Sequence, residues 1–92
     1  MVSDHPVDRL SEMYMIPIIM FLYKNGNSKK TDIYRSVSRN ATIPRKLDDL
    51  ESMGILVQEN PQSGTCTNIH LTDLGTSIAE RLRDINNEMK SN

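Results

Sequence analysis

One narrow apolar stripe, bounded at both ends, most constrains the fold of this chain. Between Ala41 or Thr42 and Met53, large apolar residues recur at four- and three-residue steps, as one face of an α-helix requires: Ile43, Leu47 and Leu50. Pro44 suits the first turn of such a helix, and Gly54 suits the left-handed residue that ends it. The segment is therefore predicted to be a helix that buries one face and leaves the opposite face open.

The chain before this helix is expected to form two more helices. Ser3 or Asp4 can cap the first one, with Pro6 in its first turn, and Pro17 is expected to kink or restart it. Residues 16–23 are apolar on nearly every side, which predicts burial against more than one neighbour.

A short helix and a tight turn are predicted next. Ser28 is expected to cap a helix from Lys29 to about Val37. The residues Ser38, Arg39 and Asn40 then form the turn that joins this helix to the helix with the apolar stripe.

A β-hairpin and a last helix complete the predicted elements. Residues 55–59 and 65–71 have the character of two strands around a turn at 60–64. Thr72 is expected to cap a helix that continues to about Met89. Its stripe consists of five apolar residues, of which the first two are expected to pack on the domain: Leu74, Ile78, Leu82, Ile85 and Met89.

The order of these elements predicts an α+β, mostly helical fold of the winged helix-turn-helix type. It comprises a three-helix core, a β-hairpin wing and a C-terminal helix. A length of 92 residues fits a single domain, which we expect to span residues 1–92.

Charge is distributed unevenly along the chain. The net charge is −1, yet residues 24–46 carry seven basic side chains against one acid, Asp32. Because this excess coincides with the helix-turn-helix, it indicates a basic face directed at a polyanion. The alternative is an ordinary solvated surface.

Double-stranded DNA is the polyanion that this arrangement favours. A helix that enters a major groove by its N-terminus presents its first residues to the bases, where Arg suits guanine and Asn suits adenine. Basic residues at the start of the preceding helix are placed to meet phosphates. The predicted DNA-binding residues are Lys29, Lys30, Arg39, Asn40, Thr42, Pro44, Arg45 and Lys46. For Asn40 and Thr42, helix capping is an equally good interpretation.

Two motifs resemble winged helix regulators of the MarR, ArsR and PadR kind. Residues 42–56, TIPRKLDDLESMGIL, are similar to the recognition helix of these families and the start of the strand that follows it. Residues 71–75, LTDLG, are similar to their Leu-Thr-x-x-Gly after the wing. The resemblance implies a cytoplasmic, dimeric transcription regulator whose helix at 42–53 binds in the DNA groove.

The predicted wing departs from these families. Their wing usually carries Arg or Lys, whereas residues 59–65 contain neither and begin with Glu59. A narrow minor groove favours inserted cations. The wing residues Gln62, Ser63 and Thr65 are therefore expected to contribute at most phosphate hydrogen bonds.

A homodimer is predicted from surplus apolar surface at the two ends of the chain. The last helix extends beyond what a small domain can cover, and the first helix is apolar all round. The residues assigned to this interface are Leu10, Tyr14, Leu82, Ile85 and Met89.

Other classes of function find little support in the sequence. It contains no Gly-rich phosphate loop and no nucleophile–base pattern, so we expect no enzyme and no cofactor. Cys66 and His70 share a strand face but are too few for a metal site. The alternative to DNA binding is a winged helix module that binds another protein, which the negative net charge and neutral wing would favour.

Overall fold

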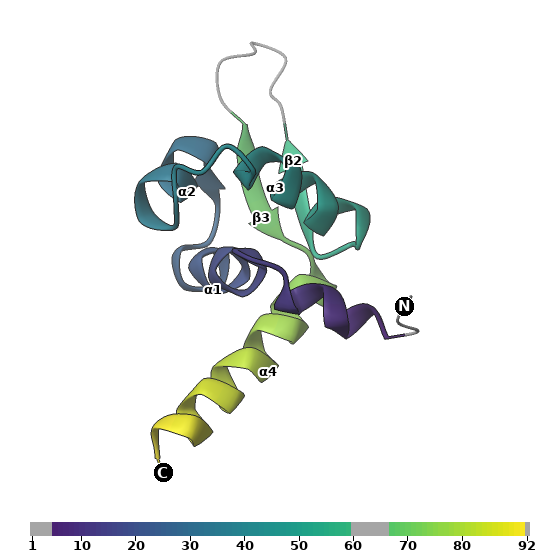
Figure 1. Cartoon of the computed structure of the whole chain (residues 1–92), viewed down its shortest axis with the longest axis vertical. Coiled ribbons are helices and arrows are strands. Elements are labelled where there is room, and N and C mark those ends of the chain that lie inside the picture. Colours follow the sequence, from purple (N-terminus) through teal and green to yellow (C-terminus); the bar gives the residue numbers. More distant parts are fainter. Residues whose placement is uncertain (1–4, 60–66, 92) are drawn as a thin grey trace.

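The computed structural model describes residues 5–59 and 67–91 and has the predicted α+β architecture. In these residues, five helices and a small antiparallel sheet surround one core (Figure 1). In chain order the elements are η1 (Pro6–Ser11), α1 (Met15–Asn25), β1 (Ser28–Lys29), α2 (Lys30–Ser36), α3 (Ile43–Ser52), β2 (Leu56–Glu59), β3 (Asn68–Leu71) and α4 (Asp73–Lys90).

The N-terminal part differs from the predicted helix with a kink at Pro17. It forms the short 3₁₀ helix η1, and the chain then turns at Tyr14, whose φ is 71°. α1 begins only at Met15, so Pro17 falls in its first turn, where no backbone N–H is required. The proposed caps Ser3 and Asp4 lie outside the described residues.

A third strand, β1, is present where a helix cap was predicted. Ser28 does not cap α2; it pairs with Ile69 of β3, is 5% exposed, and its hydroxyl donates to the Gly26 carbonyl at 3.1 Å. The start of α2 is stabilised instead by Asp32, whose carboxylate accepts from the Lys29 backbone N–H at 3.0 Å. The sheet therefore has the strand order β1-β3-β2.

The hydrophobic core joins α1, α2, α3 and the sheet. The predicted stripe of α3 is confirmed, because Ile43, Leu47 and Leu50 are fully buried. α1 buries four residues at helical spacing: Met15, Ile18, Ile19 and Leu22. Three further residues of α1 are half-buried (Met20, Phe21 and Tyr23), whereas Ile16 remains 39% exposed.

α4 is joined to the end of α3 by a close backbone contact. Thr72 caps α4 as predicted: its hydroxyl oxygen accepts from the Gly75 N–H at 3.0 Å and donates to the Gly54 carbonyl. A Cβ on Gly75 would lie 1.9 Å from the Ile55 carbonyl oxygen, so only glycine fits. Gly54 has the expected positive φ, 80°.

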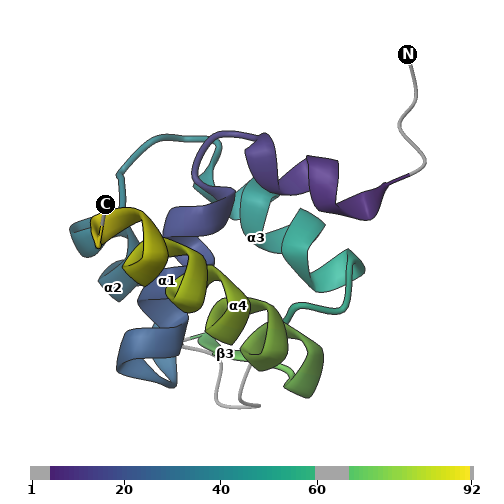
Figure 2. The ribbon, with the colours of Figure 1, turned by 90° about the horizontal axis from the view of Figure 1, so that it is seen from below.

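The apolar stripe of α4 is oriented differently from the prediction. Leu74 was expected to pack on the domain but is 52% exposed, because Gly75 and Ala79 occupy the buried positions instead. The C-terminal half of α4 extends away from the other elements (Figure 1). Figure 2 shows α4 crossing α1, and there the Arg83 guanidinium donates to the Tyr23 hydroxyl at 2.6 Å.

We predict that Gly75→Ala destabilises the protein more than Gly54→Ala. At Gly75 the added methyl meets backbone that cannot move freely, so we expect a loss of about 3 kcal/mol or more. At Gly54 the nearest atom is 3.7 Å from the added carbon, so only left-handed strain remains, roughly 1–2 kcal/mol. Urea unfolding midpoints at constant slope measure both losses. Equal losses would contradict the close-contact argument.

Candidate nucleic-acid interface

The turn before α3 is organised by Asn40. Its side-chain oxygen accepts from the Thr42 backbone N–H at 2.9 Å and from the Thr42 hydroxyl at 2.8 Å. The Asn40 carbonyl also accepts from the Ile43 N–H at 3.1 Å. The capping interpretation is thus supported for Asn40, whereas the Thr42 side chain makes no capping hydrogen bond to α3.

Basic side chains lie at the start of α2, in this turn and in the first turn of α3. Lys29, Arg39 and Arg45 are exposed, while Lys30 is half-buried at the start of α2. Within residues 5–59 and 67–91, no acid forms an ion pair with any of these four. Their charges are therefore available to an external anion.

A cleft of about 420 Å³ separates α2 from the start of α3. Its walls combine cations with neutral polar and apolar groups: Thr31, Tyr34, Arg35, Arg39, Asn40, Ala41 and Pro44. Two guanidinium groups beside a hydroxyl-bearing ring can hold a phosphodiester by charge and hydrogen bonds. The structure thus brings Arg39, Asn40 and Pro44 together in one site.

Four residues of this cleft were missed by the sequence analysis, Ala41 in the turn and three residues of α2. Thr31, Tyr34 and Arg35 line it from α2. Their spacing of three and four residues places them on one helix face, and this periodicity was the signal that could have found them.

The acids on the outer face of α3 are engaged by β2. Gln58 donates from its side-chain amide to Asp48 at 2.9 Å and to Glu51 at 3.1 Å. Its backbone N–H also donates to Glu51 at 3.1 Å. The negative side of α3 is therefore turned toward the hairpin, away from the cleft.

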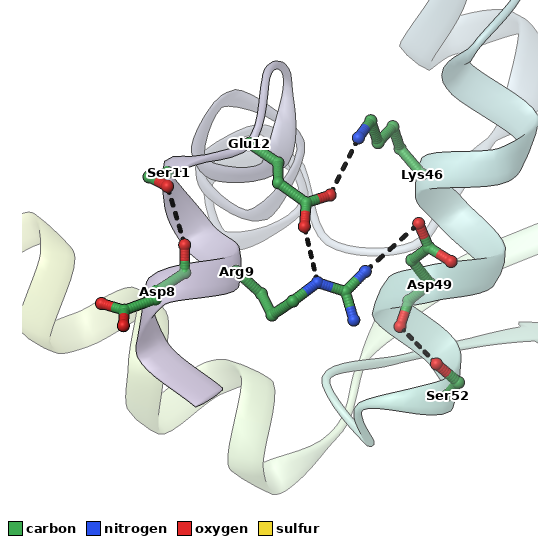
Figure 3. Close-up of polar contacts among 7 residues, drawn as sticks. All are labelled: Asp8, Arg9, Ser11, Glu12, Lys46, Asp49 and Ser52. Atoms are coloured by element: carbon green, nitrogen blue, oxygen red, sulfur yellow. Dashed lines mark hydrogen bonds and ion pairs between the residues drawn. The ribbon is translucent and has the colours of Figure 1, made fainter. Parts of the chain in front are cut away.

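Lys46 does not lie with the other cations. Its ammonium is 2.9 Å from Glu12, and only 18% of its side chain is exposed (Figure 3). Glu12 also accepts from Arg9 at 2.6 Å, and Arg9 reaches Asp49 at 3.4 Å. Four charged groups thus join η1 to α3.

These contacts shift the pKa of two groups. Hydrogen bonds from Arg9 and then Lys46 lower the pKa of the Glu12 carboxyl below its usual value. The hydrogen bond to Glu12 raises the pKa of Arg9. Glu12 is therefore ionised throughout the neutral range.

The predicted wing is described only at its base. β2 and β3 pair as an antiparallel hairpin, with Glu59 opposite Asn68 and 3.7 Å from the His70 ring nitrogen. Gln62, Ser63, Thr65 and Cys66 lie outside the described residues.

The described part of the chain holds no group of three or more His, Cys, Asp or Glu that could bind a metal ion. None of the helices in these residues is long and apolar enough to cross a membrane.

Comparison with solved structures identifies the fold. Lactococcus lactis ZitR superposes with a TM-score of 0.77 at 15% identity, over 92% of this chain and 64% of ZitR. A transcriptional regulator homologue from Pyrococcus horikoshii OT3 gives 0.74 at 16% identity, over 94% and 89%. Streptococcus pneumoniae FabT, solved in complex with DNA, gives 0.74 at 15% identity, over 92% and 65%.

These similarities show that the chain has the winged helix-turn-helix fold of transcription regulators, as predicted. The chain spans less than two thirds of the length of ZitR and FabT. No protein-family model matches the sequence, and no curated protein matches it at a significant level.

We predict that Glu12→Gln lowers the Tm at neutral pH but not in acid. The Glu12 carboxyl has a lower pKa in the folded chain than in the unfolded chain, where it is about 4.3. Its ionised form therefore stabilises the fold at pH values above the unfolded pKa. This stabilisation is lost as the pH falls through the folded pKa. The Tm difference between wild type and variant should therefore shrink as the pH falls from about 5 to about 2.5.

Thermal unfolding followed by circular dichroism measures this difference. Asp8→Asn is the matched control, since it removes the same charge from η1 at a side chain that points away from α3 (Figure 3). A Glu12→Gln effect of the same size at every pH would show that the ion pairs do not cause it.

Proposed function

We propose that this chain binds double-stranded DNA sequence-specifically as a homodimer and regulates transcription in the cytoplasm, without catalysis. The observation that carries the proposal is the set of available cations around the projecting helix α3, in a chain whose net charge is −1. FabT has the same fold and was solved bound to DNA, which supports this use of the fold.

Roles follow from position on the fold. α3 is assigned to the major groove, with Arg45 on its outer face directed at base edges. Lys29 and Lys30, at the start of α2, are assigned to phosphates. The cleft is assigned to one further phosphate, held by Arg35 and Arg39. Lys46, at the flank of α3, is assigned no DNA contact, because its ammonium is paired with Glu12.

The homodimer is supported by an apolar groove between η1 and α4. This groove of about 630 Å³ is lined mostly by apolar side chains, among them Val7, Leu10, Leu82 and Ile85. Val7 is 63% exposed, Ile85 52% and Met89 71%. A second copy would cover these side chains and place two α3 helices on one DNA site. Tyr14 packs against the core and stays an expected interface residue.

Arg45→Ala and Lys29→Ala should weaken DNA binding in different ways. Loss of a base contact should cost roughly 1–3 kcal/mol and relax sequence preference. Loss of a phosphate contact should weaken all sequences about equally and reduce the salt slope by about one. Fluorescence anisotropy separates the two effects when it is measured on two duplexes. One duplex is selected by the wild type from a random pool, and the other has a mixed sequence.

Lys90→Ala, which removes the same charge from the far end of α4, is the control and should change neither quantity. If the wild type binds neither duplex, the DNA proposal fails and the protein-binding alternative gains. If Arg45→Ala and Lys29→Ala both match Lys90→Ala, the basic face is only a solvated surface.

Ile85→Asp should weaken the dimer without unfolding the monomer. Ile85 lines the groove but is half exposed, so a charge there is tolerated in the monomer and buried only on association. Burial of an unpaired charge costs several kcal/mol, so the dimer Kd should rise at least roughly 30-fold.

Sedimentation at tens of micromolar should give about twice the monomer mass of 10.5 kDa for the wild type. Asn87→Asp places the same charge on the opposite side of α4 and should leave the mass unchanged. A wild type that sediments as a monomer would contradict the dimer.

A further inference from the structure

η1 is attached to α3 by ion pairs that act on two successive turns of that helix. Glu12 accepts from Lys46 at 2.9 Å, and Arg9 reaches Asp49, three residues further along, at 3.4 Å. Arg9 and Glu12 are themselves paired at 2.6 Å, so the two attachments form one chain of alternating charge (Figure 3). One flank of α3 is therefore held at two points about one turn apart.

This arrangement also changes which cations face outward. Lys46 directly follows Arg45, near the N-terminal end of α3, which the proposed function places at the DNA. Arg45 is exposed, whereas Glu12 holds the Lys46 ammonium against η1 with 18% of the side chain exposed. One positive charge is thus neutralised beside the predicted contact surface.

We propose that Arg9 and Glu12 are positioning residues for DNA recognition: they set the orientation of α3 and withhold Lys46 from phosphate. The inference rests on the proposed function. Its consequence is that sequence discrimination is increased at the expense of non-specific affinity. Non-specific binding depends on the number of phosphates neutralised, whereas discrimination depends on a fixed orientation of side chains toward base edges.

Salt dependence on a mixed-sequence duplex tests the role of Glu12. Glu12→Gln keeps the side-chain shape and releases Lys46, so it should tighten binding several-fold and steepen the slope of log K against log salt by about 0.9. The double variant Glu12→Gln with Lys46→Gln should return to the wild-type slope. Asp8→Asn, with the same change in net charge, should keep that slope as well.

Discrimination tests the orientation of α3. The affinity ratio between a duplex selected by the wild type and the mixed-sequence duplex should fall several-fold in Glu12→Gln. Arg9→Gln leaves the Glu12–Lys46 pair in place, so it should reduce this ratio without changing the salt slope. Two results would overturn the withholding of Lys46. One is a salt slope for Glu12→Gln equal to that of Asp8→Asn. The other is a steep salt slope that persists in the double variant.

Amide hydrogen exchange gives a reading that does not depend on DNA. Glu12→Gln and Arg9→Gln should each raise the exchange rates of α3 amides roughly two- to fivefold over Asp8→Asn. Unchanged α3 exchange in both variants would overturn the positioning role. If the wild type binds neither duplex, the proposed function fails, and exchange still decides whether Arg9 and Glu12 hold α3.

Discussion

The contact between Gly75 and the Ile55 carbonyl is the constraint on which the rest of the structure depends. It brings the first turn of α4 against Ile55, which lies between the end of α3 and the start of β2. Thr72 reinforces the contact by bonding to both segments. Because α3 carries the candidate DNA surface and α4 the candidate dimer surface, this joint sets the geometry between them. A side chain at position 75 would separate the two helices, since backbone blocks its place.

Pairing of charges, rather than their number, shapes the candidate interface. α3 and its neighbours carry both signs, but the acids Asp48 and Glu51 are bound to Gln58, and Lys46 is bound to Glu12. What remains available is a cluster of cations around the turn and the cleft, including Arg39 and Arg45. A chain with net negative charge can therefore present a positive surface, because local charges act on a ligand within about a Debye length.

The candidate site could be predicted only in part from the sequence. The confined run of basic residues indicated the region in which the structure leaves cations available, and Asn40 was placed at the turn that it organises. Arg35 was missed because its place in the candidate site depends on the cleft that α2 forms with the start of α3. Lys46 was grouped with Arg45 because neighbours in sequence share a charge pattern; the pairing with Glu12, 34 residues away, leaves no trace in that pattern.

The sequence by itself determined the features that depend on neighbours within a turn of helix or strand. These are the stripe of α3, its end at Gly54, the cap at Thr72 and the hairpin, because spacing and backbone preference act locally. Only the tertiary structure decided that Ser28 pairs with Ile69 in a third strand, that α4 turns Gly75 rather than Leu74 inward, and that η1 attaches to α3. The reason is physical: these contacts join residues far apart in the chain, and their partners are selected by the packing of the whole core.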